Sequence, residues 1–434
     1  MKGRSVLRSL LQNTTSRQSG LLFGAQLFNA VLGVGITIAN TRLLSVDDFG
    51  IFSFVTSTVM FIGWFFDFGI FTAGSRLMAV VPDSPDRKNE RPLAGALVLL
   101  AGIVSVLFAF CIILTSLFID RIFPNHIGES LLLLAPLVML FPFQGMLLLL
   151  FRGSNEIGKL AFHTVLPRVL YCCGAGIAVA VGGFTLWNSL LLNFATLTAA
   201  VLIVVAITRP VFKGVGVQIR QILRETRAYG IHLYSGTLVD ILTTGSDKLV
   251  ISYVLGATSV GFYSVAQTIV MPISMLSRSI GASAFKRFAS LERIPRNIVF
   301  INSVWIVGLA VIILAGNQWL IRIVFSEKYD VVSGIVPVLA VSMVFNGWNQ
   351  IYHSYFSARG LGITMRNISI STSALNVVAD ITLIPLIGMM GAAIADLMTC
   401  AFDYGLNRYY YRQYCRNGAV SPYHSIMPEV KKNV

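Results

Sequence analysis

Residues 93–118 read LAGALVLLAGIVSVLFAFCIILTSLF, a run of 26 residues without a charged side chain. A helix needs about 20 apolar residues to span the hydrocarbon core of a bilayer. In hydrocarbon, every backbone polar group must be satisfied within its own segment or in a closed barrel, and this run lacks the alternating pattern of a membrane barrel. The stretch therefore predicts a membrane-spanning α-helix.

Similar apolar runs recur along the whole chain. Hydrophobic residues make up 55% of the 434 residues and charged residues only 12%, about half the charged fraction of a soluble domain. The sequence therefore predicts an all-α polytopic membrane protein with twelve transmembrane helices. The predicted spans are residues 19–41, 49–75, 93–118, 130–151, 160–182, 185–207, 231–254, 259–284, 298–321, 331–357, 367–386 and 389–408.

The positive charges lie in alternate connections between these runs. With the N-terminus placed in the cytoplasm, 26 of the 33 Lys and Arg residues fall in inner segments, four in outer loops and three within spans. Such an excess of basic residues on one side sets the orientation of a membrane protein. We therefore expect both termini in the cytoplasm, and we attribute the net charge of +14 to topology rather than to nucleic-acid binding.

A weak internal repeat relates the two halves. The segment LSVDDFGIFS at 44–53 aligns with LGATSVGFYS at 255–264 at an offset of 211, which also pairs Arg76 with Arg287. The dipeptide Arg-Gly at 152–153 recurs 207 residues later. Six spans in each copy give both halves the same orientation. The predicted organisation is a six-helix lobe at 1–207, a basic cytoplasmic linker at 208–230 and a second six-helix lobe at 231–434.

Several motifs resemble the polysaccharide exporter family of the multidrug/oligosaccharidyl-lipid/polysaccharide (MOP) superfamily. The most specific is NVVADITLIPLIGMMGAAIA at 376–395, whose first-half counterpart around 171–190 is degenerate. The other motifs are FGIF at 49–52, SDK at 246–248, GFY at 261–263 and ARG at 358–360.

The resemblance implies a flippase for undecaprenyl-diphosphate-linked oligosaccharide, such as an O-antigen or exopolysaccharide repeat unit, in the inner membrane of a bacterium. It also implies alternating access between two MATE-like lobes, with helices one, two, seven and eight lining a central cavity. The expected partners are the lipid-linked oligosaccharide, membrane lipids, a glycan polymerase with its chain-length partner, and a coupling ion. No cofactor, metal or catalytic residue is expected.

Ionisable side chains within spans are the candidate functional residues, because each costs about 2.5–3.5 kcal/mol near the bilayer centre. At the offset of 211, Asp67 and Arg278 are equivalent positions of opposite charge. Each lies nine residues before the arginine of the pair Arg76 and Arg287 that belongs to its own half. Nine residues correspond to about 13.5 Å along a helix. We hypothesise that the two pair in one access state and separate in another. The alternative is that each is satisfied within its own lobe.

The seventh span carries three further candidates. Asp240 and Asp247 are seven residues apart, so they share one helix face. Lys248 follows Asp247 directly, and neighbouring side chains point about 100° apart on a helix. The two therefore cannot both face one cavity squarely. Because the resemblance places helix seven at the cavity, it implies that at least one of Asp247 and Lys248 lines it; the alternative is that one of them pairs with another helix.

Two arginines are candidates for contact with a diphosphate or an acidic sugar. Arg168 and Arg278 could do so because guanidinium binds phosphate in a bidentate manner. Packing between helices of one lobe is an equal alternative for Arg168. Asp380 and Asp396 lie on helices that the resemblance places away from the cavity, so we expect both to serve packing within the lobe.

The acidic pair Asp47 and Asp48 in the first outer loop could instead hold a metal, as in membrane glycosyltransferases that use lipid-linked donors. The equivalent positions in the second half, Thr258 and Ser259, carry no charge. We therefore favour a helix start in both halves, capped by Ser45 in the first and by Thr258 or Ser259 in the second. Acidic residues in a first turn also suit the helix dipole.

Three classes of function remain: a transporter, a membrane enzyme and a scaffold. The outer loops are short, the longest about 11 residues, and the five histidines lack a catalytic or zinc-binding spacing, which argues against an enzyme. Duplication and charges within both halves argue against a scaffold. We favour a transporter, with a cation-coupled drug exporter of the same superfamily as the alternative. Pro272 and Pro385 are predicted to kink their spans.

Overall fold

The computed structural model describes residues 14–80, 90–123, 127–231, 234, 238 and 246–416. The elements in these ranges are helices joined by short turns, so the all-α class is confirmed. Within the described residues, seven helices are long and apolar enough to cross a membrane, or up to nine if each of two bent pairs is one span. The count of twelve spans stays a prediction.

The chain divides into two compact units, residues 1–241 and 242–434. The lobe boundaries predicted from the sequence stay a prediction. The described helices of the first unit are α2 (Thr14–Leu43), α3 (Val46–Trp64), η1 (Phe65–Asp67), α4 (Ile70–Val80), α5 (Glu90–Ile122), α6 (Gly128–Val138), α7 (Pro142–Gly153), α8 (Ile157–Ala180), α9 (Leu186–Thr208), α10 (Val215–Glu225) and η2 (Thr226–Gly230).

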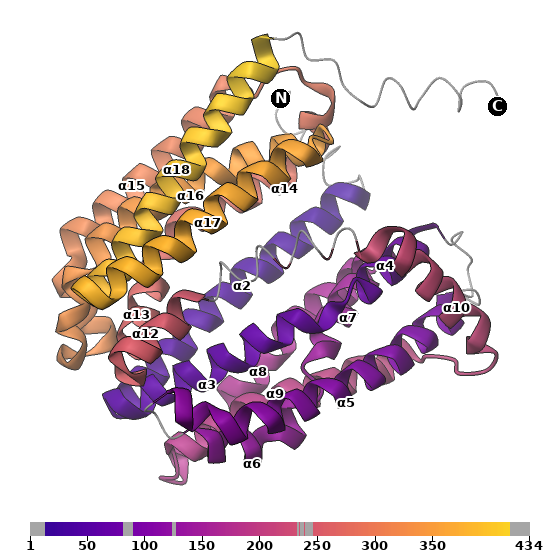
Figure 1. Cartoon of the computed structure of the whole chain (residues 1–434), viewed down its shortest axis with the longest axis horizontal. Helices are drawn as coiled ribbons and strands as arrows, with labels where there is room; N and C mark the ends of the chain where they lie inside the picture. Colours follow the sequence, from indigo (N-terminus) through magenta and orange to yellow (C-terminus); the bar gives the residue numbers. More distant parts are fainter. Residues whose placement is uncertain are drawn as a thin grey trace, which may run out of the picture. The chain divides into compact units, whose positions relative to one another are not determined.

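The second unit follows the same pattern of long helices with short connections (Figure 1). Its described helices are α12 (Ser246–Leu255), α13 (Ala257–Val270), α14 (Pro272–Ser290), α15 (Arg296–Leu320), η3 (Ile321–Phe325), η4 (Glu327–Gly334), α16 (Val336–Ala358), α17 (Gly362–Ile387) and α18 (Met389–Arg416).

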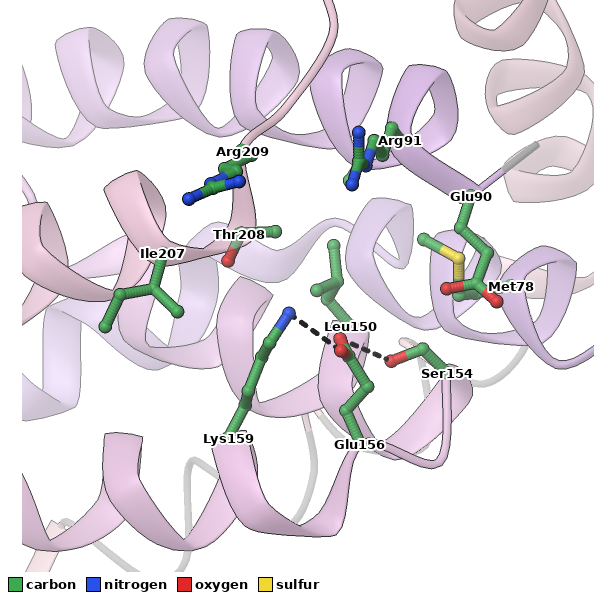
Figure 2. Close-up of a pocket in the computed structure, with 11 residues that line it drawn as sticks. Met78, Glu90, Arg91, Leu150, Ser154, Glu156, Lys159, Ile207, Thr208 and Arg209 are labelled. Carbon is green, nitrogen blue, oxygen red and sulfur yellow. Dashed lines mark hydrogen bonds and ion pairs between the residues drawn. The ribbon is translucent and has the colours of Figure 1, made fainter. Parts of the chain in front are cut away.

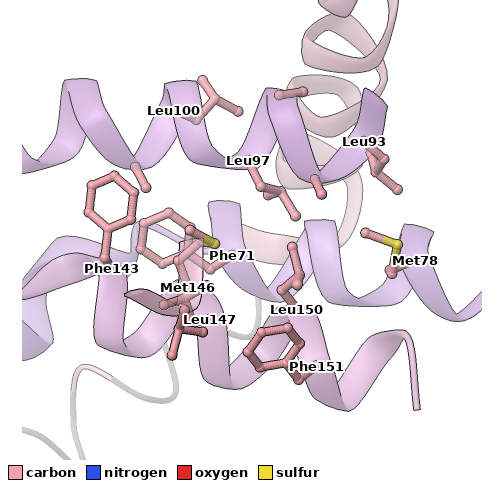
Figure 3. Close-up of a cluster of buried hydrophobic side chains, with 14 of the residues drawn as sticks. Phe71, Met78, Leu93, Leu97, Leu100, Phe143, Met146, Leu147, Leu150 and Phe151 are labelled. Carbon is pink, nitrogen blue, oxygen red and sulfur yellow. The ribbon is translucent and has the colours of Figure 1, made fainter. Parts of the chain in front are cut away.

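The core of the first unit lies between α4, α5 and α7 (Figure 3). Leu97 on α5 and Leu147 and Phe151 on α7 are almost completely buried. The same helices leave Ile103, Leu107 and other large apolar side chains of α5 exposed. A helix that is apolar on all sides is typical of a lipid environment, so the burial pattern agrees with a membrane protein.

The second predicted span is broken rather than continuous. After Trp64 the chain makes a short 3₁₀ turn, η1, and Phe68 and Gly69 then take positive φ values of 49° and 71° before α4 begins. Gly69 meets Gly230 of η2 so closely that a Cβ on Gly69 would stand 2.4 Å from the carbonyl carbon of Gly230. A side chain fits at neither glycine.

Of the two prolines predicted to kink their spans, one does so. The helix pair α13 and α14 bends by 53° immediately before Pro272, as expected for a residue that cannot donate a backbone hydrogen bond. Pro385 lies in the last turn of α17, which ends at Ile387 and is followed by Gly388 with a φ of 64°. The prediction of a kink at Pro385 is wrong, because that proline precedes a helix end instead of interrupting the span.

Candidate functional site

The carboxylate of Asp247, at the start of α12, is held by residues of two helices. Its Oδ1 accepts a hydrogen bond from the backbone N–H of Lys248 at 2.7 Å, and its Oδ2 accepts one from the Gln267 amide of α13 at 3.2 Å. Tyr263, also on α13 and 1% exposed, is a further hydrogen-bond partner. Asp247 therefore faces α13 within its own unit.

Asp396 on α18 is the second acidic group of this region. Its Oδ2 accepts a hydrogen bond of 2.6 Å from the Ser342 hydroxyl of α16, and the Cys400 thiol lies 3.9 Å from its Oδ1. Helix α12 contacts both α17 and α18. The negative charge of Asp247 is close enough to act on Asp396.

Asp380 on α17 completes the group and is the most buried of the three, with 1% of its surface exposed. Neither of its carboxyl oxygens has a hydrogen-bond partner among the described residues. It interacts electrostatically with both Asp247 and Asp396. We refer to Asp247, Asp380 and Asp396 together as the acidic cluster.

Among the residues that the structure describes, the charges of the acidic cluster do not balance. Lys248 is the basic group there that acts on Asp247, so three carboxylates and one ammonium would leave two negative charges if all were ionised. A buried charge without a partner is strongly unfavourable in a low-dielectric interior. The cluster can therefore bind a proton, and its energy depends on whether one is bound.

The acidic cluster was not predicted as a unit. Sequence reasoning named Asp247 and Lys248 as candidates and expected Asp380 and Asp396 to serve packing only. The three carboxylates come together because α12, α17 and α18 are neighbours, which their separation in the sequence does not reveal. The Asn376 amide, which lies 3.4 Å from the Thr399 hydroxyl, adds a further polar contact between α17 and α18.

Asp67 lies in the break of the second helix and is satisfied within its own unit. Its Oδ1 accepts a hydrogen bond from the backbone N–H of Phe71, and its Oδ2 accepts one from the Thr72 hydroxyl, both at 3.2 Å. Asp67 thus caps the first turn of α4. On the other side of the break, the Tyr234 hydroxyl donates to the carbonyl oxygen of Phe65 at 2.5 Å, which satisfies an acceptor that the break leaves free.

Arg168 joins two helices of the first unit. Its guanidinium on α8 donates a hydrogen bond to the carbonyl oxygen of Asn29 on α2, and it fills the space beside Gly33. These contacts favour the packing role that the sequence left open. Its proposed contact with a diphosphate stays a prediction.

The remaining predicted residues are not brought into the acidic cluster. Arg278 lies on α14 with an exposed side chain, and its pairing with Asp67 stays a prediction. Asp240 lies outside the described residues. The expectation that Asp247 or Lys248 lines a transport cavity also stays a prediction.

The acidic pair of the first outer loop lies in a capped helix start. Asp47 and Asp48 occupy the first turn of α3, and the Ser45 hydroxyl accepts a hydrogen bond from the backbone N–H of Asp48 at 3.0 Å. The predicted cap at Ser45 is therefore confirmed. The predicted cap in the second half is wrong: α13 is preceded by Gly256 with a φ of 85°, and the Ser259 hydroxyl donates back to the carbonyl oxygen of Leu255.

A small polar pocket of about 80 Å³ lies where helices of the first unit end together (Figure 2). Lys159 forms an ion pair of 2.7 Å with Glu156, whose other oxygen is 3.3 Å from the Ser154 hydroxyl. The basic side chains of Arg91 and Arg209 lie across the pocket from this pair (Figure 2). Within the described ranges, no group of three or more His, Cys, Asp or Glu side chains is placed to hold a metal ion.

The sequence matches a family of known proteins. Residues 16–292 match the model of the polysaccharide biosynthesis protein family. A candidate O-antigen transporter of Escherichia coli strain K12 is 22% identical over 379 residues, which cover 82% of this chain and 87% of that protein. An uncharacterised membrane protein of Methanocaldococcus jannaschii is 25% identical over 188 residues, covering 41% of this chain and 37% of that protein.

Two solved structures share the fold. An inward-facing multidrug resistance MATE family transporter of the MOP superfamily aligns with a TM-score of 0.67 and 14% identity, covering 90% of this chain and 96% of that one. The lipid II flippase MurJ aligns with a TM-score of 0.68 and 13% identity, covering 90% of this chain and 87% of that one. The family match extends over more than half of the sequence, and the chain belongs to the polysaccharide biosynthesis protein family.

Proposed function

We propose that the protein is a flippase that moves undecaprenyl-diphosphate-linked oligosaccharide, an O-antigen or exopolysaccharide repeat unit, across a bacterial inner membrane. The observation that carries this proposal is the family match, joined by the similarity to a candidate O-antigen transporter over 82% of the chain. We further propose twelve spans in two six-helix lobes, with both termini in the cytoplasm. Alternating access between the lobes would carry the polar glycan past the hydrocarbon core.

The energy for transport is proposed to enter at the acidic cluster. Among the described residues, the three carboxylates of Asp247, Asp380 and Asp396 outnumber the one basic group beside them, which makes the second unit sensitive to proton binding. A bound proton or cation shifts a conformational equilibrium only if it binds one state more tightly than the other. The cluster joins α12, α17 and α18, so its charge state can act on how these helices pack.

A cation-coupled drug exporter is the second candidate. It is favoured by the likeness of the fold to a multidrug resistance transporter, at a TM-score of 0.67. A drug exporter would show a drug-sensitive phenotype on deletion and no defect in surface glycan. A membrane glycosyltransferase or polymerase is not favoured, because the relatives with an assigned activity are transporters.

A deletion strain distinguishes these functions. Loss of a flippase should cause undecaprenyl-diphosphate-linked oligosaccharide to accumulate on the cytoplasmic face of the inner membrane, where an added impermeant glycosidase cannot reach it in intact spheroplasts. Re-expression of the wild-type chain should restore glycosidase access. Normal surface glycan in the deletion strain, with increased sensitivity to cationic drugs, would favour the exporter instead.

A further inference from the structure

A second polar feature runs from the acidic cluster along the contact between α16 and α18. These two helices lie side by side (Figure 1). Polar residues recur on each of them at spacings of four, three and four residues, which places each set on one helix face. The α16 set is Ser342, Asn346, Asn349 and His353, and the α18 set is Asp396, Cys400, Asp403 and Asn407. We call these eight residues the polar seam.

The first half of the polar seam begins at the acidic cluster. Asp396 accepts the hydrogen bond from Ser342, and Cys400, one turn later on α18, is within reach of the Asn346 side chain. The Asn349 amide then donates to the backbone carbonyl oxygen of Cys400 at 3.1 Å. The two helices are thus joined by polar contacts at each successive turn.

The second half of the polar seam leads to a histidine. The fully buried Asn407 amide donates to Oδ1 of Asp403 at 2.8 Å, and it lies 3.5 Å from Oδ1 of Asn349 and 3.4 Å from Nε2 of His353. Oδ2 of Asp403 lies 3.4 Å from the same ring nitrogen. His353 is the exposed end of the seam, because 37% of its side chain is accessible.

Packing alone gives an incomplete account of these residues. Asn302 of α15 already ties α16 to its other neighbour through a buried hydrogen bond to the carbonyl oxygen of Gly347. In the polar seam, polar side chains of both helices follow one another at every turn, and the side-chain oxygens of Asn346 and Asn407, like that of Asn302, have no partner among the described residues. Such buried acceptors favour ordered water, which bridges polar groups inside proteins.

We propose that the polar seam is a proton pathway between the acidic cluster and the membrane face at which α16 ends. From Ser342 to His353 it spans about 16 Å at 1.5 Å per residue. The distribution of basic residues predicts that the His353 end is cytoplasmic. Histidine is suited to this position because its ring can accept a proton at one nitrogen and release one from the other, and Oδ2 of Asp403 lies 3.4 Å from Nε2 of the ring.

The transfer conserves protons at every step. His353 takes a proton from solvent at one ring nitrogen, and the N–H bond at the other nitrogen breaks as that proton passes to a water molecule at the side-chain oxygen of Asn407. Each later step along the seam breaks one O–H bond and forms another. In the last step a carboxylate of the acidic cluster accepts the proton. Release follows the reverse order. The role of the pathway in transport rests on the proposed function, whereas proton transfer itself can be measured without a substrate.

The first test follows protonation of the acidic cluster in the full-length protein in liposomes. After a rapid pH drop, time-resolved infrared spectroscopy records the carbonyl stretch of protonated carboxyl groups, assigned with Asp380→Asn and Asp396→Asn. We expect His353→Ala to slow this rise by about tenfold or more, and added imidazole to restore the rate. An unchanged rate in His353→Ala, or a slow rate that imidazole does not restore, would overturn the proposal.

A matched control separates proton transfer from packing. Asn302→Ala removes a buried hydrogen bond from the other side of α16, and it should leave the rate of protonation within about twofold of the wild type. Slowing by Asn302→Ala equal to that by His353→Ala would assign the effect to helix packing and overturn the pathway.

A transport measurement distinguishes the pathway from the proposed function. The probe is undecaprenyl-diphosphate-linked oligosaccharide extracted from a strain that depends on this protein. We expect His353→Ala to lose flipping driven by a pH gradient and to retain exchange at equal pH on both sides. Fast protonation in a wild-type protein that moves no oligosaccharide, together with imidazole rescue of His353→Ala, would refute the proposed function and leave the pathway supported.

Discussion

Asp67 caps the helix that follows it by accepting a hydrogen bond from the Thr72 hydroxyl at 3.2 Å and another from the backbone N–H of Phe71 at the same distance. The N-terminal turn of a helix has free N–H groups, and a carboxylate there also interacts favourably with the helix dipole. In a membrane-spanning segment, water is scarce and cannot replace this cap. The broken second helix therefore depends on Asp67 for local stability.

Removal of this cap should lower stability in a graded manner. We expect Asp67→Ala to reduce the free energy of unfolding by about 0.5–2 kcal/mol, with a smaller loss for Asp67→Asn, which keeps one acceptor oxygen. Thr72→Val should reproduce part of the effect, because the bond to Phe71 remains. Thermal unfolding of the purified protein in detergent measures the series. Equal stability of Asp67→Ala and the wild type would show that the cap contributes nothing.

The contact between Gly69 and Gly230 should be intolerant of any side chain. Gly69→Ala would combine a positive φ, which costs an L-residue about 1–2 kcal/mol, with a Cβ placed 2.4 Å from backbone atoms that cannot rotate away. We expect a large loss of folded, monodisperse protein in size-exclusion chromatography. Gly102→Ala on α5 is the matched control, since a Cβ there meets nothing within 4 Å and alanine favours helix. Similar yields for both variants would contradict this account.

The helical segments were predictable because their signal is local. Apolar runs bounded by basic connections mark the helices, and Pro272 marks the bend between α13 and α14. The break at Phe65–Gly69 has no proline. It depends on Gly230 and Tyr234, which are far away in the sequence and close in space. The local pattern of the sequence therefore did not predict the break.

The candidate site was predictable only in part, for the same reason. Each residue of the acidic cluster was recognised as a costly charge within a span. The proximity of Asp247 to Asp380 and Asp396, however, follows from which helices are neighbours. The polar spacing on α16 and α18 was visible in the sequence, but its meaning required knowing that these faces meet.

Asp380→Asn should separate transport from folding. The change removes a buried charge whose oxygens have no described partner, so we expect thermal stability to be kept or increased. If the acidic cluster couples transport to an ion gradient, flipping driven by that gradient should be lost. Asp330→Asn is a control of equal chemistry, because Asp330 forms an exposed ion pair with Arg322. Gradient-driven flipping that survives in Asp380→Asn would remove this residue from the coupling site.

The predicted orientation can be tested by labelling of single cysteines. In a background without the five native cysteines, Val181→Cys lies in an exposed turn after α8, and Lys213→Cys lies in the basic segment after α9. The excess of basic residues predicts an outer position for the first and a cytoplasmic position for the second. An impermeant maleimide should label Val181→Cys in intact spheroplasts and Lys213→Cys only after lysis. The reverse pattern would invert the topology.

A reciprocal substitution tests the relation that the repeat predicts between Asp67 and Arg278. If the two pair during transport, Asp67→Arg and Arg278→Asp should each reduce flipping strongly, because each single change places like charges together. The double variant restores opposite charges and should recover much of the activity. Asp67 also caps α4, so the recovery should be incomplete, and thermal stability must be measured beside transport.

The size of the recovery decides between pairing and independence. A coupling energy well above about 0.5 kcal/mol between the two sites, calculated from the four transport rates, would support a direct interaction. Defects that simply add in the double variant would show that Asp67 serves its own helix and that Arg278 acts elsewhere. Asp67→Arg combined with Arg287→Asp is the matched control. Arg287 lies on the same helix as Arg278, but it is not the repeat equivalent of Asp67. Rescue by this control as well would indicate a general charge effect instead of a specific pair.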